Sequence, residues 1–91
     1  MYRVRLRSKR VHKQLDDISS SDFHLVDAKL MALRENPRPR GCIKLVDNIY
    51  RVRAGAYRII DYIDDEERLV DVGKIARRTE RTYKNIEALF R

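Results

Sequence analysis

The chain of 91 residues is 43% apolar and 38% charged, and its 21 Lys and Arg outnumber its 14 Asp and Glu to give a net charge of +7 at pH 7. That length predicts one modest domain spanning residues 1–91, and the apolar fraction is too high for a disordered chain. No apolar run approaches the ~18 residues that cross a bilayer, and the single cysteine excludes an internal disulfide. Because no secretory leader opens the sequence, we expect a cytoplasmic protein without membrane contact.

The positive charge is segregated along the chain, which favours a polyanionic partner. The bases between residues 38 and 58 are accompanied by Asp47 alone, whereas acids gather in the DDEE segment at 64–67. Nucleic acid is the first candidate partner and an acidic protein is the second, while a merely soluble basic surface is the alternative. The segregated bases are Arg38, Arg40, Lys44, Arg51, Arg53 and Arg58.

The first half of the chain predicts a strand followed by a helical hairpin. Residues 2–7 (YRVRLR) alternate apolar and basic side chains, as is typical of a half-buried strand. Ser8 can cap a short helix with apolar positions at Val11, Leu15 and Ile18. The serines at 19–21 interrupt it, and a second helix runs to about Glu35, where the segment NPRPRG at 36–41 ends it.

The second half predicts strands joined by short turns, and hence an antiparallel meander. The strands are expected at 42–46, 49–54, 57–64 and 69–76. Thr79 can cap a final helix that carries Tyr83, Ile86 and Phe90 on one stripe. We summarise the fold class as α+β in the order β-α-α-β-β-β-α, an antiparallel sheet with the helical hairpin on one face and a C-terminal helix.

Several familiar kinds of site are absent from the sequence. His12 and His24 lack a second ligand at metal-binding spacing, and Cys42 is expected to pack as a small apolar residue. No serine stands in a nucleophile-elbow context, and three glycines provide no phosphate loop. Asp64 and Asp65 are expected to form a solvated turn. We therefore expect no metal and no cofactor.

The segment YRVRAGAYR at 50–58 predicts a tight hairpin that turns at Gly55-Ala56. Arg53 would then lie opposite Arg58, with Arg51 on the same face. Like charges in opposite positions destabilise a sheet, so this face calls for an explanation. One alternative is that the aliphatic stems cover the sheet while the charged heads reach water. A three-residue loop would shift the register and scatter the arginines.

The segments YRVRAGAYRIIDYIDDEERLVDV and IARRTERTY resemble the RelE branch of the RelE/ParE toxins, which belong to type II toxin–antitoxin systems, and the resemblance spans essentially the whole chain. It implies a RelE-like fold and a ribosome-dependent, metal-independent endoribonuclease. Such a toxin cleaves mRNA in the ribosomal A site through attack by the RNA's own 2′-hydroxyl. The resemblance also implies a cognate antitoxin that holds the enzyme inactive.

Positions matched to the family imply the site residues. Arg58 matches an arginine that contacts the scissile phosphate, Arg78 matches one that supports the phosphorane or the leaving group, and Tyr83 matches a tyrosine that acts as base or orients it. Arg77 and Arg78 remain alternatives for the arginine after the last strand. Family members often carry lysines where this chain has arginines at 51 and 53, so one proton acceptor is missing. The RNA-binding residues implied are Arg51, Arg53, Lys74, Arg77 and Arg81.

The chemistry of these residues limits their roles. Arginine stays protonated and cannot be the base, which leaves Tyr83, with Lys74 as a possible helper. A tyrosine base at neutral pH needs a pKa about 3 units below its usual ~10, a change that nearby arginines favour. Gly73 is a further departure, because glycine weakens a strand. Two other readings stay open: a ParE-like inhibitor of DNA gyrase without nuclease activity, and an inactive module that binds only antitoxin or RNA.

Overall fold

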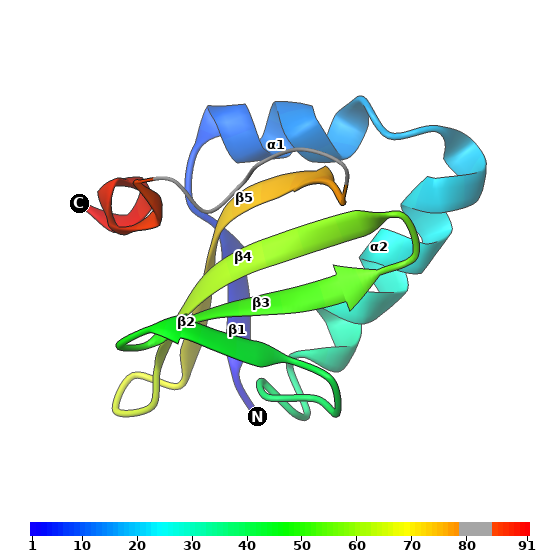
Figure 1. The fold of residues 1–91 in the computed structure, drawn as a ribbon. Helices are drawn as coiled ribbons and strands as arrows, with labels where there is room; N and C mark the ends of the chain where they lie inside the picture. Colours follow the sequence, from blue (N-terminus) through cyan, green and yellow to red (C-terminus); the bar gives the residue numbers. More distant parts are fainter. Residues whose placement is uncertain (79–84) are drawn as a thin grey trace.

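The computed structural model describes residues 1–78 and 85–91. All four strands predicted after the helical hairpin are present, so the summary order was one strand short (Figure 1). The elements are β1 (Arg3–Leu6), α1 (Lys9–Asp16), α2 (Ser20–Ala32), β2 (Ile43–Val46), β3 (Ile49–Ala54), β4 (Tyr57–Asp64), β5 (Leu69–Arg77) and the 3-10 helix η1 (Ile86–Phe90).

The strands form one five-stranded sheet in the order β1-β5-β4-β3-β2. Strands β2 to β5 make the predicted antiparallel meander. Strand β1 joins the free edge of β5 in parallel, with Arg3 opposite Leu69, so the sheet is mixed rather than wholly antiparallel. The two helices carry the chain from β1 to the far edge of the sheet, and the meander then returns β5 to the side of β1 (Figure 1).

The helical hairpin covers one face of the sheet, as the sequence predicts (Figure 1). The Ser8 hydroxyl caps α1 by accepting a 3.4 Å hydrogen bond from the Val11 N–H. Gln14 of α1 accepts a 2.8 Å hydrogen bond from the backbone N–H of Ile75, beyond the end of the β1–β5 pairing. A core between helices and sheet follows, with Val11, Val26, Leu33, Ile59, Ile63, Val70 and Val72 all within 1% of full burial.

The opposite face of the sheet, here called the open face, is partly covered by η1. Ile49, Ile60 and Ile86 form a small second core there, and Phe90 packs against it. The predicted start of the final helix at Thr79 lies outside the described residues, and the described end of the chain is a 3-10 helix rather than an α-helix. The predicted apolar stripe of Ile86 and Phe90 nevertheless faces the sheet.

Gly73 has a packing role that the sequence leaves unexplained. The β4–β5 register shifts so that Ile60 pairs with Lys74 while Asp61 pairs with Val72, which makes Gly73 the extra residue of a bulge. The ring of Phe90 occupies the space beside it, and a Cβ at position 73 would lie 2.6 Å from the ring. Glycine therefore lets η1 approach the sheet closely.

Candidate active site

The β3–β4 hairpin has the predicted register. Arg53 lies opposite Arg58, and Arg51 lies opposite Ile60 on the same face. Gly55 makes the turn with φ of +60°, a conformation that favours glycine, and a Cβ there would lie 3.0 Å from the Leu25 side chain. Arg53 is exposed, Arg58 is half-buried and Arg51 is 7% exposed. The fold thus places three arginines on the open face, where the hairpin turns.

The end of β5 brings two further arginines to this hairpin. The backbone N–H of Arg78 donates a 2.8 Å hydrogen bond to the carbonyl of Ala56, which ties the chain after β5 to the turn. A cavity of about 340 Å³ results, and the residues that line it are Ala56, Arg58, Arg77 and Arg78. No acidic side chain from the described part of the chain lines it. We call this hollow the arginine cavity.

The register separates Arg77 from Arg78. Arg77 pairs with Tyr57 across β4 and β5, and its guanidinium lies 5.4 Å from the centre of the Tyr57 ring. Arg58 pairs with Ala76, so strand alternation puts Arg78, two residues beyond Ala76, in phase with Arg58. Arg77 is committed to a ring on the core side, and the geometry favours Arg78 as the partner of Arg58.

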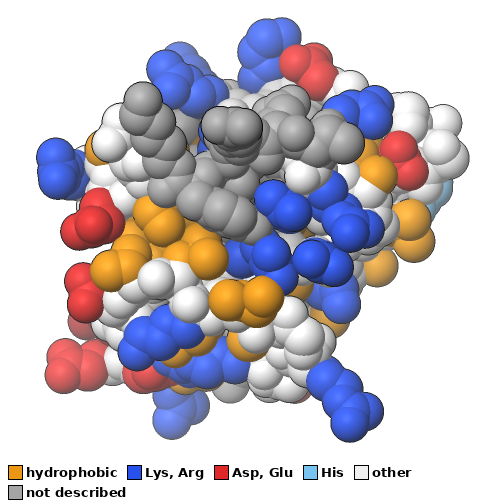
Figure 2. Space-filling model, in the orientation of Figure 1, with side chains coloured by type: hydrophobic (Ala, Val, Ile, Leu, Met, Phe, Trp, Pro, Cys, Tyr) orange, Lys and Arg blue, Asp and Glu red, His pale blue; other side chains and the backbone are white. Residues whose placement is uncertain are grey.

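The remaining predicted site residues are distributed around this cavity. Arg51 and Arg53 line a neighbouring cavity of about 350 Å³. Lys74 lies in a third, of about 290 Å³, together with Arg77 and the α1 residues Gln14 and Asp17. Tyr83 and Arg81 lie outside the described residues. Figure 2 shows the open face, where Lys and Arg side chains gather over the turning end of β3 and β4.

Arg38 departs from the expected basic surface. Its guanidinium donates two hydrogen bonds of 3.0 and 2.9 Å to the carboxylate of Asp65 and one of 3.1 Å to the Tyr50 hydroxyl. The Tyr2 hydroxyl donates to the same carboxylate at 2.6 Å. Hydrogen bonds from Arg38 and then from Tyr2 lower the pKa of Asp65. This charge holds the loop after α2 against the β4–β5 turn, and it is not available to a ligand on the open face.

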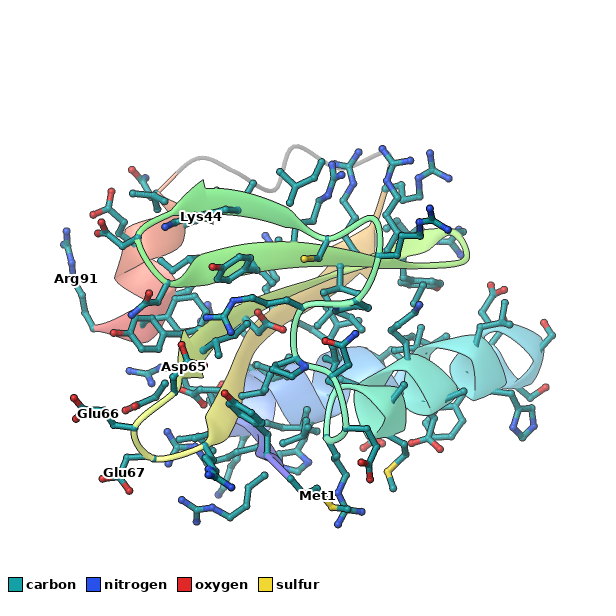
Figure 3. The ribbon with its side chains drawn as sticks, turned by 90° about the horizontal axis from the view of Figure 1, so that it is seen from below. Met1, Lys44, Asp65, Glu66, Glu67 and Arg91 are labelled. Carbon is teal, nitrogen blue, oxygen red and sulfur yellow. The ribbon has the colours of Figure 1, made fainter. Side chains whose placement is uncertain are left out.

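The acidic turn is thus divided between structure and solvent. Figure 3 shows Asp65 turned toward the body of the protein, whereas Glu66 and Glu67 point away from it. The expectation of a solvated turn holds for the two glutamates, which are exposed. It is wrong for Asp65, because its partner Arg38 is 27 residues away and leaves no local signal.

A buried carboxyl, that of Asp61, lies in the centre of β4 on the side that faces the helices. Its exposed fraction is 0%, and neither carboxyl oxygen has a hydrogen-bond partner among the described residues. Burial raises its pKa to about 8, although the charge of Arg38 acts in the opposite direction. The sequence offered a signal, because Asp61 continues the alternation of Tyr57, Ile59 and Ile63 on the core face.

Two properties of the described residues complete this description. No group of three or more His, Cys, Asp or Glu side chains within residues 1–78 and 85–91 could hold a metal ion. None of the helices in that part of the chain is long and apolar enough to cross a membrane.

Comparison with known proteins identifies the family. No family model matches the sequence. The protein named toxin RelE1 of Methanocaldococcus jannaschii is 34% identical over 82 residues, which cover 85% of this chain and 90% of the relative. Three solved structures share the fold at 22–23% identity. They are the archaeal RelE–RelB complex of Pyrococcus horikoshii (TM-score 0.74, 87% of this chain and 97% of that chain), the isolated RelE toxin of E. coli (0.74, 99% and 97%) and the RelBE2 toxin–antitoxin complex of Mycobacterium tuberculosis (0.72, 85% and 98%). The described fold and the sequence relationship agree, and the chain belongs to the RelE family of toxins.

Proposed function

We propose that this chain is the toxin of a type II toxin–antitoxin system and cleaves mRNA in the ribosomal A site. The observation that carries the proposal is the arginine cavity, in which Arg58, Arg77 and Arg78 from two separate strands line one hollow. A guanidinium group binds a phosphate through paired N–H donors, and several of them match the charge of a phosphodiester undergoing attack. Membership of the RelE family supports the same conclusion.

The reaction uses the RNA as its own nucleophile. The 2′-oxygen attacks the adjacent phosphorus as its proton leaves, the bond from phosphorus to the 5′-oxygen breaks, and that oxygen gains a proton. The upstream fragment ends in a 2′,3′-cyclic phosphate and the downstream fragment begins with a 5′-hydroxyl. Negative charge builds on the non-bridging oxygens, and preorganised guanidinium groups stabilise it.

Three residues have catalytic roles in this proposal. Arg58 contacts the scissile phosphate, Arg78 stabilises the developing charge or the leaving oxygen, and Tyr83 accepts or orients the proton of the 2′-hydroxyl. Arginine cannot accept that proton, because it is always charged in a protein. Surrounding arginines favour the phenolate form of a tyrosine, which is what a base at neutral pH requires.

The other basic residues bind the RNA backbone in this scheme. They are Arg51, Arg53, Lys74, Arg77 and Arg81. The facing pair of Arg53 and Arg58 costs stability in the free protein, and a bound phosphate relieves that repulsion. The hairpin therefore exchanges some stability of the free toxin for affinity toward RNA.

A cognate antitoxin is the expected protein partner. Two of the structures with the same fold are toxin–antitoxin complexes. An acidic or amphipathic segment of that antitoxin would neutralise the basic open face or displace the C-terminal helix. Co-expression with the product of a neighbouring short gene should rescue growth and yield a complex that elutes together.

The deciding experiment is addition of the purified protein to a translating extract. We expect mRNA cut only when ribosomes are present, with 5′-hydroxyl ends on the downstream fragments. Arg58→Ala should abolish these cuts. Intact mRNA alongside normal translation would overturn the nuclease proposal. Loss of supercoiling by DNA gyrase would then indicate the ParE-like activity, and binding of RNA or antitoxin alone would indicate an inactive module.

A further inference from the structure

A second basic hollow lies beside the arginine cavity, on the other side of the hairpin. It has a volume of about 350 Å³ and brings together bases from α2, from the loop after it and from β3. Its lining consists of Lys29, Arg40, Gly41, Cys42, Ile43, Arg51, Val52 and Arg53. No Asp or Glu from the described residues lines it. We call it the Arg40 cavity.

The short length of β2 creates this hollow. Strand β2 pairs with β3 only from Ile43, opposite Arg51, so the last residues of β3 extend past the end of their partner. The loop before β2 turns back on itself, with the Cys42 N–H donating a 3.0 Å hydrogen bond to the Pro39 carbonyl. This turn leaves a space bounded by α2 on one side and by the exposed Arg53 on the other.

The two hollows form one continuous basic track. Arg53 lines the Arg40 cavity, Arg58 lines the arginine cavity, and these two residues are cross-strand partners. Partners in an antiparallel pair have Cα atoms about 5 Å apart, roughly the spacing of neighbouring phosphates along an RNA strand. A strand that presents one phosphate to Arg58 can therefore present the next ones toward Arg53 and Arg40.

We propose that the Arg40 cavity binds the phosphodiester backbone of single-stranded RNA next to the scissile phosphate, with Lys29 and Arg40 as its new contacts; this inference rests on the proposed function. Charge complementarity and continuity with the arginine cavity favour RNA over an acidic polypeptide. The apolar floor of Ile43, Cys42 and Val52 offers a surface for a sugar or base between phosphates.

The cysteine within the lining provides a direct test. Cys42 is the only cysteine in the chain and is partly exposed, so the rate of its reaction with a maleimide reports whether the cavity is occupied. A 2′-O-methyl RNA oligonucleotide, which lacks the attacking hydroxyl and stays intact, should slow labelling several-fold at low salt. Polyglutamate of equal charge should slow it much less. Equal or stronger protection by polyglutamate would overturn the choice of RNA and indicate an acidic protein partner.

Matched variants separate this site from net charge. Lys29→Ala combined with Arg40→Ala removes two charges from the cavity, and Lys13→Ala combined with Arg34→Ala removes two from the helical layer. The first pair should lose most of the protection of Cys42, and the slope of log affinity against log salt should fall by about 1. The second pair should retain both. Equal losses in the two double variants would show that only the overall charge matters, and would overturn the proposed site.

The cleavage assay distinguishes failure of this inference from failure of the proposed function. In a translating extract, the variant with Lys29→Ala and Arg40→Ala should need roughly tenfold more protein for half-maximal cleavage, an effect larger than any fall in maximal rate. Wild-type cleavage with no such shift, and with Cys42 unprotected by RNA, would overturn the Arg40 cavity and leave the nuclease standing. Protection of Cys42 without any cleavage would leave the binding site standing and overturn the nuclease.

Discussion

The ring of Phe90 lies against the backbone of Gly73, at the bulge where β5 pairs with β4. This contact fixes η1 to the open face. The Tyr62 ring packs on the other side of Phe90, with centroids 5.9 Å apart, and the Arg7 guanidinium lies 5.6 Å from the centre of the Phe90 ring. Arg7 also donates a 3.1 Å hydrogen bond to the carbonyl of Arg91. The last turn of the chain is therefore held by one glycine, two aromatic rings and one guanidinium.

Gly73→Ala should displace Phe90 and lower the free energy of unfolding by about 1–2 kcal/mol, as measured by urea denaturation. The new Cβ would meet the far end of one side chain, which can move, so the loss is that of Phe90 packing rather than strain in the main core. Phe90→Ala should cost a similar amount. The double variant should cost little more than either single change, because both remove the same contact. Additive losses would contradict this account of Gly73.

Asp61→Asn should flatten the dependence of stability on pH. The carboxyl has a folded pKa of about 8 against an ordinary 3.8, so between these values the folded state holds a proton that the unfolded state has released. Wild-type stability must therefore fall as pH rises across this window, with a slope of up to about 1.4 kcal/mol per pH unit. Asparagine has the shape of the neutral acid and does not titrate.

Urea denaturation at pH 5, 6, 7 and 8 measures that slope. Asp27→Asn, a change at an exposed position, is the matched control and should keep the wild-type dependence. A wild-type curve that is flat or rises between pH 5 and 8 would show that the buried carboxyl is ionised in the folded protein.

The predictable parts of this fold are those specified by neighbouring residues. The hairpin register follows from a two-residue turn and the alternation of residues 50–58, and all three arginines appear on the face expected of them. The apolar stripes of α1 and α2 likewise predict which surfaces meet the sheet. The burial of Asp61 follows from the same alternation, although a charged residue obscured the pattern.

The unpredicted parts depend on contacts between distant segments. Parallel pairing of β1 with β5 joins residues such as Arg3 and Leu69, and no local turn specifies the orientation of such a pair. The clustering of bases between 38 and 58 suggested one basic surface, yet Arg38 binds Asp65 while Arg40, two residues on, lines a cavity on the open face. The bulge at Gly73 was visible only as an anomaly, because its cause is a phenylalanine near the other end of the domain's last segment.

Arg38→Ala should lower the free energy of unfolding by about 1 kcal/mol and leave RNA binding unchanged. The ion pair with Asp65 is partly exposed, with 35% and 55% of the two side chains accessible, which limits its contribution. Arg38→Lys should recover only part of the loss, because a lysine cannot make the paired hydrogen bonds to the carboxylate. Denaturation measures the stability, and the protection of Cys42 by RNA measures the binding. A loss of RNA binding in Arg38→Ala equal to that in Arg40→Ala would contradict the division of these two arginines.

Arg78→Ala should reduce the rate of mRNA cleavage about 10²- to 10³-fold, the cost of removing one preorganised donor from a developing negative charge. Arg77→Ala should reduce it much less. The reason is the register, which puts Arg78 in phase with Arg58 and commits Arg77 to the ring of Tyr57. Arg77→Ala should instead lower stability by roughly 0.5–1 kcal/mol through loss of that contact. Single-turnover cleavage on programmed ribosomes, together with urea denaturation, measures both effects, and the opposite order of the two cleavage rates would make Arg77 the catalytic arginine.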